Sequence, residues 1–248
     1  MVDAFGWRKV FAVLGPSTNT IVQPDMDSMR PAGVTNQYRD IYVEDPVALS
    51  DEAFLAGAQK ISEGMKDALR TAMTCRPDYL VLGVSAISFN GGLGGARAFV
   101  EEIRSFTGCE ISVGSLAVAD ALRTYGGIKR ISFLSPYYPA ANAQVREFFT
   151  ECGYDVARDI ALRCTSWTNI ARVGEAQLRD GIRELDGPDV DAIVQVGTNL
   201  SMVRLAAEAE RWLAKPVIAI NAATYWHALR SSGIIDRVSG FGRLLEDF

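Results

Sequence analysis

Four clusters of hydroxyl, amide and phenol side chains follow directly after apolar runs of strand length, and none of them contains a charged residue. The clusters are Gly15-Pro16-Ser17-Thr18-Asn19, Ser85-Ala86, Ser135-Pro136-Tyr137-Tyr138 and Gly197-Thr198-Asn199. In open parallel sheets, ligands bind beyond the carboxyl ends of the strands, where backbone N–H groups point outward. Neutral donors of this kind suit a small carboxylate. One cluster alone predicts only a helix cap, but four together predict a shared binding site.

An internal repeat is expected to bring these clusters together. Residues 10–16 match 131–136, residues 78–82 match 191–195, and residues 111–122 match 218–229. Each matched segment contains an apolar run that stops at small polar residues. Two similar halves that face each other would place all four clusters around one cleft.

Short apolar runs alternate with longer amphipathic stretches along the chain. The runs at 10–14, 79–84, 111–113, 131–134, 192–196 and 217–220 lack polar alternation, which is typical of strands buried on both faces. Apolar residues recur at helical spacing in 50–74, 95–106, 117–125, 140–152, 175–185, 202–213 and 224–232, and 33–45 is expected to be a further strand. This alternation predicts an α/β fold with two pseudo-symmetric lobes, each a parallel sheet flanked by helices, with the active site at the lobe interface.

The repeat also sets the expected domain boundaries. The first lobe is predicted to contain residues 1–112 and 216–248, and the second lobe residues 113–215. The C-terminal segment is assigned to the first lobe because its start matches the end of the first half. The chain would then cross between the lobes twice.

The bulk properties argue against several classes of protein. Of the 248 residues, 48% are hydrophobic and 22% are charged, and the net charge is −5. Because the charges are scattered, no basic face is available for nucleic acid. No apolar run approaches the length of a membrane span, and residues 1–5 do not resemble a secretory signal. We therefore expect a cytoplasmic homo-oligomer with reduced cysteines that binds neither membranes nor nucleic acid.

The order and spacing of several motifs resemble the aspartate/glutamate racemase superfamily, and within it the branch of arylmalonate decarboxylase and maleate cis-trans isomerase. Residues 15–20 are similar to the maleate isomerase N-terminal signature, and residues 85–89 resemble the first substrate loop of the decarboxylase. Tyr137 falls on the segment whose tyrosine holds a carboxylate in both groups. Asn169 and the turn at 221–226 resemble further parts of these enzymes. The resemblance implies a small carboxylate or cyclic carbonyl substrate and no cofactor.

The sequence departs from this family at the residues that perform its chemistry. The racemases and isomerases place one cysteine after the second strand of each half, and the decarboxylase keeps only the second cysteine. Here these positions hold Val84, or its neighbour Gly83, and Gly197. The resemblance therefore implies that both thiols are absent, and Gly197 is expected to leave space for water or a bulkier substrate. The four cysteines are expected to fill core volume.

We predict Tyr137, Ser85 and Thr198 as the catalytic residues. Substrate binding is assigned to Ser17, Thr18, Asn19, Ala86, Tyr138, Asn169, Gly197 and Asn199. Neither a metal nor a cofactor is expected, because the sequence has no cluster with metal-ligand spacing and no phosphate-binding loop. His227, the only histidine, is expected at the surface or as a helix cap, and Asp25 is a candidate acid.

With both thiols absent, the sequence favours chemistry carried by water or by the substrate itself. The predicted function is a cofactor-independent hydrolase or lyase of a catabolic pathway, acting by ring opening, hydration or elimination. One alternative is a decarboxylase or cis-trans isomerase of the family type. Another alternative is a non-catalytic protein that binds a small acid.

Overall fold

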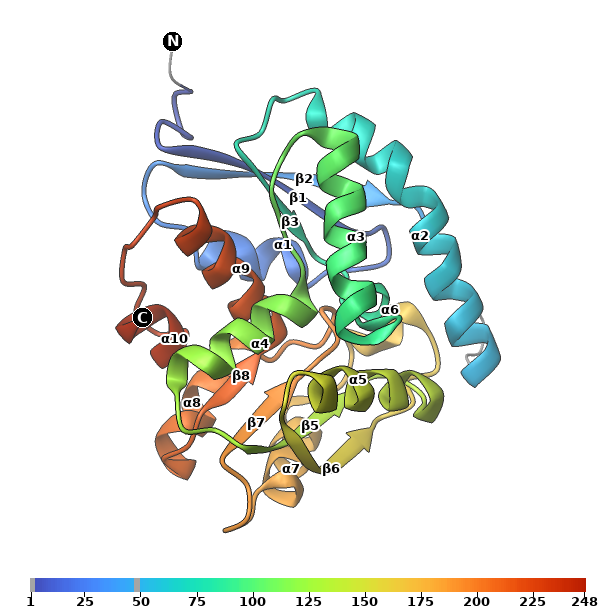
Figure 1. The fold of residues 1–248 in the computed structure, drawn as a ribbon, viewed down its shortest axis with the longest axis vertical. Coiled ribbons are helices and arrows are strands. Elements are labelled where there is room, and N and C mark those ends of the chain that lie inside the picture. Colours follow the sequence, from blue (N-terminus) through green and yellow to red (C-terminus); the bar gives the residue numbers. More distant parts are fainter. Residues whose placement is uncertain (1–2, 47–49) are drawn as a thin grey trace.

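Two four-stranded parallel sheets form the framework of the molecule (Figure 1). The structure is a computed structural model that describes residues 3–46 and 50–248. The strand order is β2-β1-β3-β4 in the first sheet and β6-β5-β7-β8 in the second, so the internal repeat appears as one strand order used twice. The strands are β1 Lys9–Pro16, β2 Val34–Ile41, β3 Tyr79–Leu82, β4 Ile111–Ser112, β5 Arg130–Ser135, β6 Asp155–Ala161, β7 Ala192–Gln195 and β8 Val217–Ala219.

Equivalent strands pair in the same way in the two sheets. Residues 11–14 of β1 lie beside 79–82 of β3, and residues 131–134 of β5 lie beside 192–195 of β7. Strands β3 and β7 are buried over their whole length, as expected for parallel strands covered by helices on both faces. The predicted α/β fold class is confirmed, and the segment predicted as a strand at 33–45 forms β2.

Helices connect the strands and cover both sheets. They are α1 Val22–Ser28, α2 Asp51–Met73, α3 Gly92–Thr107, α4 Gly114–Tyr125, α5 Pro139–Glu151, α6 Trp167–Ile170, α7 Glu175–Leu185, α8 Val203–Leu213, α9 Ile220–Ser231 and α10 Arg243–Asp247, with a 3-10 helix, η1, at Ala86–Phe89. Ser50 caps α2, because its side chain accepts a hydrogen bond from the backbone N–H of Ala53. All seven predicted helices are present, although α3, α4 and α9 begin three or four residues before their predicted starts. Among the described residues, no helix is long and apolar enough to cross a membrane.

Helices α4 and α9 pack against each other, and both lie close to the junction of the two sheets (Figure 1). Strand β8, at the start of the segment 216–248, is hydrogen-bonded to β7 of the second sheet. This pairing gives partners to backbone groups of β7 that would otherwise be buried and unsatisfied. Helix α9 follows directly and contacts β3 and β4 of the first sheet. The assignment of 216–248 to the first lobe is therefore corrected at β8, and the rest of the division stays a prediction.

Candidate active site

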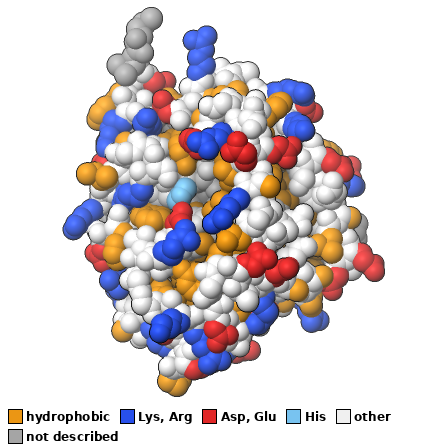
Figure 2. Space-filling view, in the orientation of Figure 1, with side chains coloured by type: hydrophobic (Ala, Val, Ile, Leu, Met, Phe, Trp, Pro, Cys, Tyr) orange, Lys and Arg blue, Asp and Glu red, His pale blue; other side chains and the backbone are white. Residues whose placement is uncertain are grey.

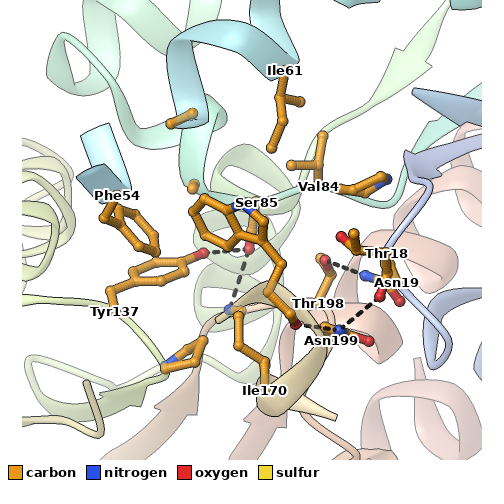
Figure 3. Close-up of a pocket in the computed structure, with 16 residues that line it drawn as sticks. Thr18, Asn19, Phe54, Ile61, Val84, Ser85, Tyr137, Ile170, Thr198 and Asn199 are labelled. Atoms are coloured by element: carbon orange, nitrogen blue, oxygen red, sulfur yellow. Dashed lines mark hydrogen bonds between the residues drawn. The ribbon is translucent and has the colours of Figure 1, made fainter. Parts of the chain in front are cut away.

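One cavity gathers the loops that follow β1, β3, β5 and β7, which are two strands from each sheet (Figure 3). Its volume is about 450 Å³, including the space at its mouth. The lining consists of Pro16, Thr18, Asn19, Phe54, Ala58, Ile61, Val84, Ser85, Ala86, Pro136, Tyr137, Trp167, Ile170, Gly197, Thr198 and Asn199. The cavity is thus shared by the two sheets and lies at the carboxyl ends of strands, where parallel sheets bind ligands.

Eight of the eleven predicted site residues line this cavity. They are Thr18, Asn19, Ser85, Ala86, Tyr137, Gly197, Thr198 and Asn199. The three others lie outside the lining formed by the described residues. The Ser17 hydroxyl exchanges hydrogen bonds with the backbone of Val43, and Tyr138 is the N-cap residue of α5. The Asn169 amide is bonded within its own segment, to Thr165 and Arg172.

Two hydroxyl groups from opposite lobes meet inside the cavity. Ser85 Oγ and Tyr137 OH lie 2.6 Å apart, and the backbone N–H of Gly197 donates to Ser85 Oγ at 3.2 Å (Figure 3). If Ser85 donates its proton to the phenol oxygen, the phenol O–H is available to donate to a ligand. Burial raises the pKa of Tyr137 above its ordinary value, so the phenol is protonated at neutral pH. Tyr137 is therefore suited to donate a hydrogen bond; the raised pKa makes it a weaker acid and leaves no phenolate to act as a base.

The hydroxyl of Thr198 already donates one hydrogen bond and accepts another within the protein. It donates to the carbonyl of Gly83 at 2.9 Å and accepts from Asn19 Nδ2 at 3.1 Å. Asn19 Oδ1 in turn accepts the backbone N–H groups of Ile21 and Val22, which gives partners to donors at the start of α1. We predicted Thr198 as catalytic, but its hydrogen bonds connect the loops that follow β1, β3 and β7, which is a structural role.

Asn199 is also engaged by neighbouring loops. Its Oδ1 accepts the backbone N–H of Thr20 at 3.1 Å, and its Nδ2 donates to the carbonyl of Trp167 at 2.9 Å. The amides of Asn19 and Asn199 therefore hold the cavity together, whereas we had expected them to be free to bind a carboxylate. The hydroxyl pair of Ser85 and Tyr137 is left as the main polar feature that can face a ligand.

An apolar wall that sequence reasoning missed forms the other side of the cavity. Helix α2 contributes Phe54, Ala58 and Ile61, and helix α6 contributes Trp167 and Ile170. The Phe54 ring centre lies 5.0 Å from that of Tyr137 and 4.9 Å from that of Trp167. The apolar stripe of α2 was visible in the sequence, but it predicted only a helix and not a wall of the site. The single turn α6 is too short to show a helical period.

Within the described residues, the cavity lining contains no Asp, Glu, Lys, Arg or His. Asp25, the candidate acid, lies behind the cavity. It accepts a hydrogen bond from Asn221 Nδ2 at 2.8 Å, and the same Nδ2 donates to the carbonyl of Thr198 at 2.9 Å. Burial raises the pKa of Asp25 to about 6. Asp25 thus lies outside the cavity lining and is connected to the loop of Thr198 through Asn221.

The two positions at which the family resemblance implies cysteines differ in their surroundings. Val84 lines the cavity, whereas a Cβ at Gly83 would lie 2.5 Å from Val22 Cγ1. Gly197 has a φ of +97°, and a Cβ at this position would lie 2.2 Å from Pro136 Cδ. The expectation that Gly197 leaves open space is wrong, because Pro136 occupies that space.

The four cysteines lie outside the cavity lining. They are Cys75, Cys109, Cys152 and Cys164, and burial raises the pKa of each thiol. At neutral pH these thiols are protonated and poorly nucleophilic. Within the described residues, no group of three or more His, Cys, Asp or Glu side chains is arranged to hold a metal ion.

Comparison with known proteins identifies the family. The arylmalonate decarboxylase family model matches residues 49–245, so the chain belongs to the arylmalonate decarboxylase family. Arylmalonate decarboxylase from Bordetella bronchiseptica is 27% identical over 194 residues, which cover 77% of this chain and 80% of that protein. Maleate isomerase from Geobacillus stearothermophilus is 28% identical over 131 residues, which cover 52% of this chain and 51% of that protein.

The solved structures include a cysteine-to-serine variant of maleate cis-trans isomerase from Nocardia farcinica with a covalently bound succinylcysteine intermediate. It matches with a TM-score of 0.87 and 20% identity, over 97% of this chain and 99% of that chain. At this identity the likeness establishes the fold alone. The family relationship favours the decarboxylase or isomerase alternative and gives no support to the predicted hydrolytic reaction.

Proposed function

We propose that this protein is a decarboxylase of a small activated carboxylic acid, such as a malonate with an apolar substituent, and that it works without a catalytic cysteine. The observation that carries the proposal is the two-sided cavity. An apolar wall that includes Phe54, Ile61 and Trp167 faces the hydroxyl pair of Ser85 and Tyr137, with no charged side chain in the described lining.

Such a cavity supplies what decarboxylation needs. A carboxylate held against the apolar wall loses its hydration, which favours its departure as neutral carbon dioxide. The carbon–carbon bond breaks, and its electron pair moves into the remaining carboxyl group to form an enediolate. The Tyr137 O–H donates to the oxygen on which this charge develops. A proton from Tyr137 or from water then reaches the carbon, and solvent restores the donor.

Residues around the pair have positioning roles in this proposal. The backbone N–H of Gly197 orients Ser85, and Ser85 orients the phenol of Tyr137. Asn19, Thr198 and Asn199 fix the loops, while Thr18 and Ala86 complete the lining. Val84 and Gly197 are proposed to stand where other members of the superfamily have cysteines.

The rival reactions need groups that the described lining does not contain. Isomerisation through a covalent thiolate adduct, of the kind that the succinylcysteine intermediate of the Nocardia protein represents, requires a thiol at the substrate. Hydrolysis requires a base that activates water, and the raised pKa of Tyr137 makes it unsuitable. Decarboxylation requires neither a nucleophile nor a base.

The test is a substrate panel without added cofactor, containing phenylmalonate, methylmalonate, maleate, maleimide and a small lactone, followed by proton NMR. We expect only a substituted malonate to react, with release of carbon dioxide. Tyr137→Phe should lower kcat/KM by about 10- to 100-fold, the effect of losing a hydrogen bond worth roughly 1.5–3 kcal/mol to a charged oxygen. Tyr138→Phe, the adjacent phenol outside the lining, is the matched control and should change kcat/KM less than about threefold. Conversion of maleate to fumarate, or binding of a malonate without turnover, would contradict the proposal.

A further inference from the structure

A second cavity lies between α3, α4, α9 and β4, away from the proposed active site. Its volume is about 1040 Å³, including the space at its mouth. Leu93, Val100 and Leu116 are among its apolar walls. Figure 2 shows the only histidine of the chain, His227, half-buried on this face with basic and acidic side chains nearby. The cavity shares none of its lining residues with the first one.

A row of hydrogen bonds crosses the base of this cavity. His227 Nδ1 lies 2.6 Å from Ser112 Oγ, and His227 Nε2 lies 3.1 Å from Asp120 Oδ2. The row holds the half-buried histidine at the cavity wall through both of its ring nitrogens. Ser112 is fully buried, so it cannot act as a nucleophile toward a ligand. The row therefore fixes the orientation of His227 and Asp120 and does not form a hydrolytic triad.

The charges around the cavity favour an anion. Its lining contains Arg97, Arg104 and Arg123 against two carboxylates, Glu110 and Asp120. Arg104 pairs with Glu110 and, outside the lining, with Glu101, while Arg123 pairs with Asp120. Among the described residues Arg97 forms no ion pair, so the lining has one uncompensated cation in a chain whose net charge is −5. An anion at this rim can also draw on Arg123, which it would share with Asp120.

We infer that this cavity is a second binding site, for a small organic anion with an apolar body. Arg97 binds the anionic group, and the walls formed by Leu93, Val100 and Leu116 contact the apolar body. The ligand class follows from the combination of a basic rim with apolar walls, because a charged head and an apolar body each find a complementary surface. The inference does not depend on the proposed reaction.

His227 provides a specific reporter, because a chain with one histidine gives one set of imidazole signals. The experiment titrates benzoate into the full-length protein at constant ionic strength and follows the His227 imidazole by NMR. We expect a saturable shift. Arg97→Glu should weaken the apparent affinity at least about tenfold, whereas Arg97→Lys, which keeps the charge, should stay within about threefold. Arg183→Ala, which removes an exposed arginine on α7, is the control for general charge effects.

A separate control distinguishes this site from the proposed active site. Helix α9 begins with Ile220 and Asn221, and Asn221 donates to the carbonyl of Thr198, so the first cavity is connected to the helix that carries His227. Tyr137→Phe should leave the benzoate titration unchanged. No shift of His227, or a titration that Tyr137→Phe weakens and Arg97→Glu does not, would overturn the inference. Inorganic phosphate, which lacks an apolar body, should bind at least about tenfold more weakly, and equal affinity would refute the assigned ligand class.

Discussion

Adding a single methyl group at Gly197 tests the geometry on which the site depends. At a φ of +97° a residue with a Cβ is strained, and a left-handed conformation costs roughly 1–2 kcal/mol per residue. The added Cβ would also lie 2.2 Å from Pro136 Cδ and 2.5 Å from Pro136 Cγ. Relief of such a collision by local movement typically costs about 1–3 kcal/mol. We therefore expect Gly197→Ala to lower the free energy of unfolding by about 2–5 kcal/mol.

Gly153→Ala is the matched control for this variant. Gly153 has a φ of +91°, close to that of Gly197, but a Cβ there would meet nothing within 4 Å. Urea unfolding of both variants, with unchanged m-values, therefore isolates the collision with Pro136. Gly197→Ala should be the less stable of the two by about 1–3 kcal/mol. It should also lose activity, because Pro136 precedes Tyr137. Equal stability of the two variants would show that position 197 does not press on Pro136.

Two further predictions concern residues behind the cavity. Asn19→Ala removes the hydrogen bonds to the backbone at the start of α1 and the bond to Thr198, and should cost about 1–2 kcal/mol of stability in urea unfolding. This cost should exceed that of Ser50→Ala, which removes a single cap bond from α2, and an effect no larger than that of Ser50→Ala would refute the link between the loops. Burial raises the pKa of Asp25 to about 6, above its value in the unfolded chain, so the native state binds this proton more tightly. The free energy of unfolding should therefore fall by up to about 3 kcal/mol as the pH rises from about 4 to about 6. Asp25→Asn should remove this fall in pH-dependent unfolding, and an unchanged slope would contradict the assignment.

The repeat and the uninterrupted apolar runs made the fold predictable from the sequence. Matched segments predicted two similar lobes, each with a parallel sheet, because strands buried on both faces require an apolar composition that is visible in the sequence. The start of 216–248 was misplaced because sequence similarity to the end of the first half does not specify which sheet edge a short strand joins. Pairing with β7 is a tertiary choice made by backbone hydrogen bonds.

The site could be predicted in part only. Residue type and position placed Ser85 and Tyr137 in the cavity, but an amide such as Asn199 has the same appearance whether it binds a ligand or a neighbouring loop. The positive φ of Gly197 and the position of Pro136 are properties of the folded backbone. Trp167 was missed because α6 is a single turn. Sequence patterns thus identified which loops meet, and packing decided which side chains remain available.

Replacement of all four cysteines tests the central claim, decarboxylation without a thiol, most directly. The measurement is the rate of carbon dioxide release from a substituted malonate by the wild-type protein and by a variant with Cys75, Cys109, Cys152 and Cys164 changed to Ala, after circular dichroism has shown that the variant is folded. We predict that the wild type releases carbon dioxide and that the variant retains kcat within about tenfold, a barrier change below about 1.4 kcal/mol. Absence of carbon dioxide release by the wild type, or its loss in the folded variant with recovery when one cysteine is restored, would contradict the account.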